Sequence, residues 1–359
     1  MARKILILGA SYGSLLGTKL VMAGHDVTLV CRNATADLIN AEGTEVRIKL
    51  KGEDTHRAIR SADEVGRLDA RTPQDVDPAG YDMVALAMQE PQYAATEIRI
   101  LMRRIAQAGV PCLSIMNMPP LPYLRRLTGL DPVALEPAYK DASIWDLFEP
   151  GLVSLCSPDP QAFRPPEEAP NVLHVGLPTN FKAATFADPA HTAMLEELAA
   201  DIDAVRLDGQ DVPVKLRVHD SLFVPLAKWA MLLAGNYRCL TLGGERAIQE
   251  AVHDEPAVSK SVYQFVNTLA QRLGADPADQ VPFEKYANAA RSLMKPSSAA
   301  RAVRAGATDI ERVDRLVQLI AGQVGMAHPV VDATVRVVNA RINRNIEAVL
   351  DAADARDVA

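Results

Sequence analysis

The chain has 359 residues, of which 48% are hydrophobic and 23% are charged, and its formal net charge is -7. This composition is typical of a globular protein, and the length exceeds what one compact core usually holds, so we expect two domains. A negative charge without a run of Lys or Arg argues against nucleic acid as a partner. No stretch approaches the roughly 20 apolar residues of a membrane span, so we expect no membrane association either.

The four cysteines lie far apart and match no metal-ligand spacing: Cys31, Cys112, Cys156 and Cys239. The histidines, among them His25, His56 and His253, make no metal-like cluster with nearby carboxylates. We therefore expect no metal, reduced thiols and a cytoplasmic location.

The first half alternates short β-rich runs with helical patterns, which is typical of a parallel sheet covered on both faces. Buried strands are predicted at residues 4–8, 26–31, 83–88 and 112–116. Helical periodicity occupies residues 15–23, 34–41 and 94–108 between them. The pattern predicts an α/β fold that begins with a Rossmann-type, doubly wound parallel sheet.

The second half becomes all helical after residue 210. Helices are predicted at residues 222–234, 245–252, 257–273, 283–293, 309–324 and 330–350. The last two are long and carry apolar residues at spacings of three and four, as core-facing helices do. We expect domains at 1–210 and 211–359, the second all-helical and suited to substrate binding and to forming a homodimer.

A glycine loop follows the first strand and opens the first helix. It reads Gly9-Ala-Ser11-Tyr12-Gly13, where the usual pattern is G-x-G-x-x-G. Small residues let a dinucleotide's pyrophosphate approach the free N–H groups of the helix N-terminus. The first domain is therefore predicted to bind a dinucleotide, although glycine turns also follow strands for steric reasons alone.

The end of the second strand carries Arg32 and Asn33. An enzyme that uses NAD normally places Asp or Glu here for the ribose 2′-hydroxyl, whereas a 2′-phosphate calls for a cation. A guanidinium can grip a phosphate with two parallel hydrogen bonds. The pair favours NADP(H), unless Arg32 is merely a solvated residue at a strand end.

Lys228 is the only charge between Ser221 and Asn236. Burying an ammonium costs several kcal/mol unless it finds partners. On an α-helix Lys228 and Asn236 would face the same groove, about 80° apart. The pattern indicates a lysine that protonates a carbonyl oxygen as hydride arrives, or else one that snorkels from an amphipathic helix.

At this point the sequence resembles the ketopantoate reductase family. The resemblance is carried in family order by residues 4–33, Ser114-Ile-Met-Asn117, Lys228-x7-Asn236, Lys295-Pro-Ser297-Ser298, Thr308-Asp309-Ile310-Glu311 and Gly325-Met-Ala-His-Pro329. It implies Lys228 and Asp309 as catalytic residues, and Asn236 with Ser297 or Ser298 as substrate ligands. The implied cofactor residues are Gly9, Ser11, Tyr12, Gly13, Arg32, Asn33, Gln89 and Asn117. Asp309 also suits an ordinary helix N-terminus, and Asn117 an ordinary turn.

Three positions depart from the family pattern. Leu232 replaces the first Asn of the K-x3-N-x3-N pattern, Gln89 replaces a Lys, and Met118 follows Asn117 where Gly is usual. Loss of the Asn favours a more apolar substrate. The sequence predicts an NADPH-dependent reductase acting on a 2-oxo acid or related carbonyl compound. The alternatives are an opine dehydrogenase-like reaction through an imine, with His219 supplying the base, and a non-catalytic NADPH sensor.

Overall fold

The computed structural model describes residues 1–357, and for residues 355–357 it describes the backbone only. The chain forms two compact units. Unit 1 comprises Met1–Arg126 and Ala142–Pro225, and unit 2 comprises Leu127–Asp141 and the chain from Leu226 onward. The division falls after residue 225, beyond the expected boundary at 210, and the short segment before Ala142 belongs to the helical unit.

Unit 1 is built on an eight-stranded sheet with the order β14-β11-β8-β7-β6-β1-β2-β5. Its strands are β1 (Lys4–Leu8), β2 (Asp26–Val30), β5 (Leu68–Arg71), β6 (Met83–Leu86), β7 (Cys112–Ile115), β8 (Val153–Ser157), β11 (Phe181–Ala184) and β14 (Leu216–His219). The six from β5 to β8 run parallel, and β11 pairs antiparallel with β8. The central strands are buried along their length because helices cover both faces. The predicted Rossmann-type sheet is confirmed.

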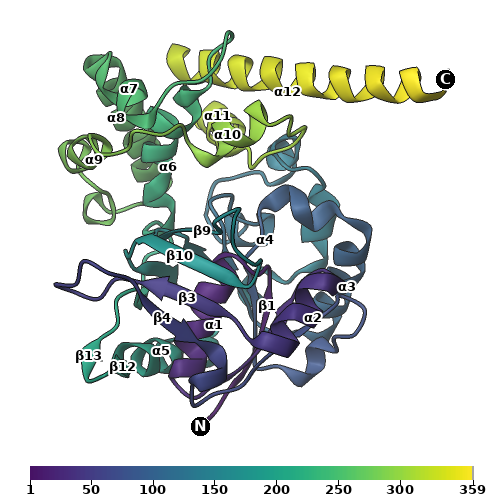
Figure 1. The fold of residues 1–359 in the computed structure, drawn as a ribbon. Coiled ribbons are helices and arrows are strands. Elements are labelled where there is room, and N and C mark those ends of the chain that lie inside the picture. The colour runs from purple at the N-terminus through teal and green to yellow at the C-terminus, as the bar shows by residue number, and fades with distance from the viewer. Residues whose placement is uncertain (358–359) are drawn as a thin grey trace. The chain divides into compact units, whose positions relative to one another are not determined.

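The strand order reverses direction beside β1. The chain first moves outward through α1 (Tyr12–Met22) to β2, then returns to β6 and continues through α3 (Thr96–Ala108) to β7. Right-handed crossovers that leave in opposite directions place their helices on opposite faces. α5 (Pro189–Ala204) packs beside α1 (Figure 1). α2 (Asn33–Glu42) packs against β5. In sheets of this kind ligands bind at the carboxyl edge next to the reversal, here between β1 and β6.

A second sheet packs on the same unit; the sequence indicates a β-like piece at residues 172–175, but it does not predict a separate sheet. It has the order β4-β3-β10-β9, with β3 (Glu45–Ile48), β4 (Arg57–Arg60), β9 (Gln161–Phe163) and β10 (Val172–Leu177). β3 and α1 contact each other, so that α1 is enclosed by two sheets and α5. This enclosure explains why residues 13–22 are buried on every side of α1.

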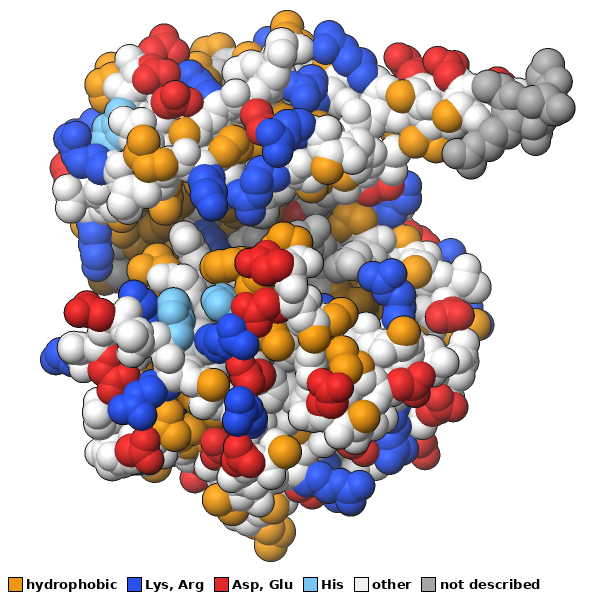
Figure 2. All heavy atoms as spheres, viewed as in Figure 1, with side chains coloured by type: hydrophobic (Ala, Val, Ile, Leu, Met, Phe, Trp, Pro, Cys, Tyr) orange, Lys and Arg blue, Asp and Glu red, His pale blue; other side chains and the backbone are white. Residues whose placement is uncertain are grey.

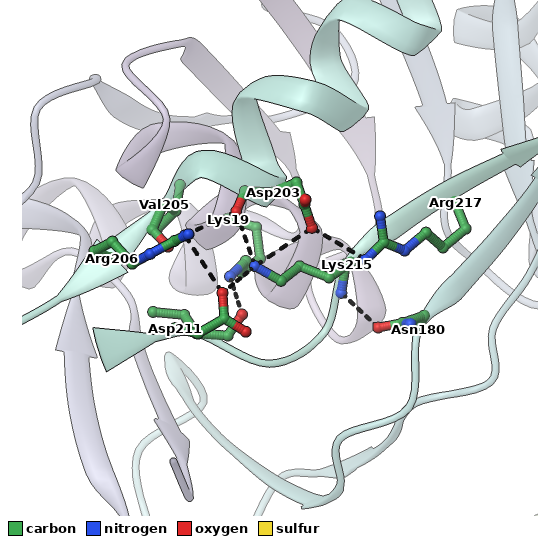
Figure 3. Close-up of polar contacts among 9 residues, drawn as sticks. Lys19, Asn180, Asp203, Val205, Arg206, Asp211, Lys215 and Arg217 are labelled. Carbon is green, nitrogen blue, oxygen red and sulfur yellow. Dashed lines mark hydrogen bonds and ion pairs between the residues drawn. The ribbon is translucent and has the colours of Figure 1, made fainter. Parts of the chain in front are cut away.

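Lys19 lies near the C-terminal end of α1 and is 1% exposed. Its ammonium donates to the Val212 carbonyl at 3.1 Å. Lys215 lies beside it and donates to Asp211 at 2.7 Å and to the Asp203 carbonyl at 3.0 Å (Figure 3). Burial, then the charge of Lys215, lowers the pKa of Lys19 from 10.5 to about 7. We call these residues, together with Arg206 and Arg217, the Lys19 cluster.

Unit 2 is helical. It contains α6 (Lys228–Met231), α7 (Ile248–His253), α8 (Pro256–Arg272), α9 (Phe283–Ala290), α10 (Ser298–Arg304), α11 (Val313–Gln323) and α12 (Pro329–Asp357). α11 packs against α12 and against the short helix Val133–Ala138. That contact explains why residues 127–141 join this unit. Among the described residues, no helix is long and apolar enough to span a membrane.

Several element boundaries differ from the predicted ones. The region after residue 210 is not all helical, because β13 (Gln210–Asp211) pairs with β12 (Arg206–Leu207) and β14 completes the main sheet. The predicted helix at 222–234 is broken into a 3-10 turn, α6 and a π-helix at Leu232–Asn236. The helix predicted from residue 309 begins at Val313. Periodicity over a short apolar run does not distinguish these helix types.

Candidate functional site

The glycine loop joins β1 to α1 and lies against the end of β6. Gly9 has φ +103°, and a Cβ there would lie 2.7 Å from the Ala87 carbonyl oxygen. A Cβ on Gly13 would lie 2.7 Å from Ile7 Cγ2. Ser11 precedes α1, and its hydroxyl makes no capping hydrogen bond to the helix. The sequence thus uses small residues where the backbone turns most tightly, and the N-terminus of α1 is not capped by a side chain.

The predicted cofactor residues of unit 1 all follow the carboxyl ends of neighbouring parallel strands. Gly9, Ser11, Tyr12 and Gly13 follow β1, Arg32 and Asn33 follow β2, Gln89 follows β6, and Asn117 follows β7. The sheet order therefore brings together four segments that are far apart in sequence. Gln89 is exposed at the start of a 3-10 helix, and its backbone N–H bonds to Gln92. A nucleotide is the ligand for which such an edge is suited.

Arg32 and Asn33 are both exposed at the start of α2. Among the residues that the structure describes, no carboxylate pairs with the Arg32 guanidinium. An exposed, uncompensated arginine at this strand end fits a 2′-phosphate better than a 2′-hydroxyl.

Arg164 is a candidate that the sequence did not suggest. It follows β9 of the second sheet, yet its Nη2 donates to the Ala10 carbonyl in the glycine loop at 2.6 Å. No local motif marks it, because the contact spans 154 residues and depends on the packing of the second sheet.

A hollow of unit 1 lies between α2 and β5. It has a volume of about 680 Å³ and is lined by Asn33, Arg71, Thr72 and three carboxylates, those of Asp37, Asp69 and Asp75. Those carboxylates would repel a phosphate. We therefore place the candidate site at the glycine loop, with this hollow beside it.

Lys228 is half-buried and begins α6, immediately before the π-helix. The hydroxyl of Tyr286 lies against this wider turn: it donates to the Met231 carbonyl at 3.1 Å and occupies the space that a Cβ on Gly235 would need. Such single-turn π segments often occur at functional sites. The widened turn means that the 80° relation between Lys228 and Asn236, calculated for an α-helix, does not apply.

Asn236 ends the π-helix, and one predicted residue, Ser297, contacts this end. The Ser297 hydroxyl donates to the Asn236 carbonyl at 2.7 Å and also caps α10 by accepting from Ala300. Ser297 is buried, whereas Ser298 is exposed. The contacts give Ser297 a structural role that the sequence did not indicate.

Asp309 does not lie at a helix N-terminus, so the alternative reading of that residue was wrong. It precedes α11 by four residues and pairs with Lys140 at 2.9 Å. Tyr237 fixes the following segment, since its hydroxyl donates to the Glu311 carbonyl and accepts from the Val313 N–H. Asn236, Ser297 and the segment after Asp309 therefore gather at one end of the π-helix. Sequence reasoning missed Lys140 and Tyr237, because neither carries a motif.

The candidate site residues do not form a metal site. Over the described part of the chain, no three His, Cys, Asp or Glu side chains gather as metal ligands.

Comparison with known proteins agrees with this geometry. Residues 5–102 match the family model described as ketopantoate reductase PanE/ApbA. No curated protein matches the sequence. Similar solved structures include a 2-dehydropantoate 2-reductase from Methylococcus capsulatus, with TM-score 0.66 and 14% identity over 95% of this chain and 97% of that one.

Two further structures are similar at comparable coverage. D-mandelate dehydrogenase, solved with NADH and anilino(oxo)acetate, has TM-score 0.63 and 15% identity over 95% of this chain and 99% of that one. A dimeric ketopantoate reductase from Staphylococcus aureus has TM-score 0.57 and 10% identity over the same shares.

The fold, a Rossmann-type unit followed by a helical unit, is shared with these solved structures along nearly the whole chain. The predicted resemblance to the ketopantoate reductase family is confirmed, because residues 5–102 match its sequence model and solved structures of that name have this fold.

Proposed function

We propose that this protein is an NADPH-dependent reductase that reduces the carbonyl of a 2-oxo acid or a related compound. The observation that carries the proposal is the carboxyl edge of the main sheet, where a tight glycine loop, an uncapped helix N-terminus and an uncompensated Arg32 adjoin. These groups suit a dinucleotide with an additional phosphate.

When bound, NADPH supplies the hydride. Gly9, Ser11 and Gly13 let the backbone N–H groups of α1 meet the pyrophosphate, and Arg32 with Asn33 binds the 2′-phosphate. We assign Gln89 and Asn117, which follow β6 and β7, to the cofactor as well, as the family resemblance implies.

Lys228 stabilises negative charge on the substrate oxygen and donates its proton. Asn236 and Ser298 bind polar groups of the substrate, and Asp309, paired with Lys140, is the acidic member of the set. The buried Leu232 on the π-helix favours a substrate with an apolar side chain.

The test is NADPH oxidation measured over a panel of 2-oxo acids and ketones, with and without amines. We expect turnover without amine. A requirement for amine would indicate opine-type chemistry, and binding of NADPH without any oxidation would indicate a sensor; either outcome contradicts the proposal.

On an established substrate, Lys228→Ala should lower kcat by about a hundredfold to a thousandfold, or roughly 3 to 4 kcal/mol, because the developing alkoxide loses its cationic partner. The Kd for NADPH should stay within about twofold. Lys228→Arg should not restore activity, since a guanidinium does not readily release a proton.

A matched control is Lys285→Ala, which removes an exposed lysine from α9 of the same unit. It should leave kcat unchanged. If Lys228→Ala retains more than about a tenth of the activity, general-acid catalysis by Lys228 is wrong.

We also propose a homodimer formed through α12. Its C-terminal half exposes Ile346, Val349 and Leu350 at spacings of three and four, as a helix that packs against a partner does (Figures 1 and 2). Light scattering should give twice the 38.8 kDa chain mass, and Val349→Asp with Leu350→Asp should give the monomer. A monomeric wild type would contradict this assignment.

A further inference from the structure

Arg164 links the second sheet to the glycine loop. It follows β9, and its Nη2 donates to the Ala10 carbonyl at 2.6 Å. The same carbonyl accepts from the Ser14 hydroxyl on the first turn of α1. Arg164 therefore contacts the loop at the residue between Gly9 and Ser11.

The guanidinium of Arg164 is not neutralised. Among the described residues it pairs with no carboxylate, and its Nε is buried without a hydrogen-bond partner. Arg47 of the same sheet contrasts with it, because Arg47 pairs with both Glu45 and Glu168. An unneutralised guanidinium that is partly removed from water is costly unless a ligand supplies the negative charge.

The surroundings of Arg164 extend to the end of β2. Burial, the largest cause, lowers the pKa of Arg164, and the positive charge of Arg32 lowers it further. Burial raises the pKa of Cys31 to about 11, while the charge of Arg164 opposes that rise. Arg164 thus lies within electrostatic reach of the strand end where a 2′-phosphate would bind.

We propose that Arg164 is a second arginine of the 2′-phosphate site, which acts together with Arg32 and fixes the glycine loop through the Ala10 carbonyl. The inference rests on the proposed use of NADP(H). A pair of arginines that lack carboxylate partners favours a doubly charged phosphate, whereas an NAD site needs neither cation. The second sheet thereby takes part in cofactor choice through one side chain.

The experiment uses two nucleotides that differ only in the 2′-phosphate, adenosine 2′,5′-bisphosphate and AMP. Their Kd values are measured by calorimetry with the full chain, as wild type, Arg164→Ala and Arg164→Lys. We expect Arg164→Ala to weaken binding of the bisphosphate about tenfold to a hundredfold and binding of AMP less than threefold. Arg164→Lys should lie between, because it keeps the charge but loses the planar fork.

Salt dependence supplies an independent readout. The wild-type affinity for the bisphosphate should fall as salt is added, because salt screens the contacts between the arginines and the phosphate. Arg164→Ala removes one of these contacts, so the affinity of this variant should depend less steeply on salt concentration. Arg103→Ala, which removes an exposed arginine from α3, is the matched control and should change neither affinity nor slope.

The outcomes separate the two proposals. Equal losses for both nucleotides would mean that Arg164 only positions the loop, and no loss would mean that it does neither; both results overturn the inference while leaving the proposed function intact. A wild type that binds both nucleotides equally well overturns the NADP(H) preference and the inference together. If Arg164→Ala fails to fold, Arg164→Lys decides. A preference for the bisphosphate in that variant as strong as in wild type would overturn the inference that the planar guanidinium of Arg164 binds the 2′-phosphate.

Discussion

Two groups of cations in unit 1 differ in how their charge is balanced. In the Lys19 cluster, Lys215 meets Asp203 and Asp211, and Lys19 itself meets a backbone carbonyl. At the carboxyl edge of the sheet, Arg32 and Arg164 meet no carboxylate among the described residues. The first group has its acidic partners within the protein, whereas we propose that an anionic ligand completes the second.

The difference shows how a fold separates stability from binding. The Lys19 cluster lies near the C-terminal end of α1, whereas Arg164 contacts the loop before α1 and Arg32 precedes α2. The buried groups of the Lys19 cluster affect the stability of the fold, and we propose that the two arginines act in ligand binding. Substitutions in the two groups should therefore be visible in different measurements.

The largest expected effect concerns Lys19 and the free energy of unfolding. Its pKa is about 7 in the folded chain and 10.5 when exposed, so unfolding takes up a proton between these values. The stability contributed by this residue should therefore rise as pH increases from about 7 to 10.5, by at most about 1.4 kcal/mol per pH unit. Lys19→Met should remove much of this slope, which denaturant unfolding at pH 7 and pH 9 measures.

The other titratable groups that interact electrostatically with Lys19 are Lys215, Arg206, Asp203, Asp211 and Glu64. All of them are present in both proteins, so the difference between wild type and Lys19→Met isolates Lys19. Equal slopes for the two proteins would show that Lys19 stays charged in the folded state. Arg32→Ala, which removes an exposed side chain before α2, should leave the free energy of unfolding within about 0.5 kcal/mol of wild type.

Much of unit 1 could be predicted from the sequence because its strands are short, apolar and bounded by turns. β1 was predicted with its observed ends, and β2, β6 and β7 to within two residues. The second sheet was missed because its strands are short and partly exposed, so their burial pattern depends on tertiary packing. The π-helix was missed because periodicity over a short apolar run does not distinguish helix types, and its contact with Tyr286 spans more than 50 residues.

The residues of the candidate site likewise divide into those that the sequence predicts and those that it does not. Gly9, Gly13 and Arg32 are visible in the sequence because their function depends on local backbone and strand position. Arg164 and Lys140 are invisible because each reaches its partner across more than 150 residues. Residue type and spacing carry no information about such contacts.

The remaining prediction tests the central claim, that the carboxyl edge of unit 1 binds NADP(H) through uncompensated arginines. The measurement is the Kd of NADPH and of NADH, by fluorescence titration, for wild type and Arg32→Ala. The account predicts that wild type binds NADPH more tightly than NADH, and that Arg32→Ala weakens NADPH by about 1.5 to 3 kcal/mol while NADH changes little. Equal losses for both cofactors, or a wild type that prefers NADH, would contradict it.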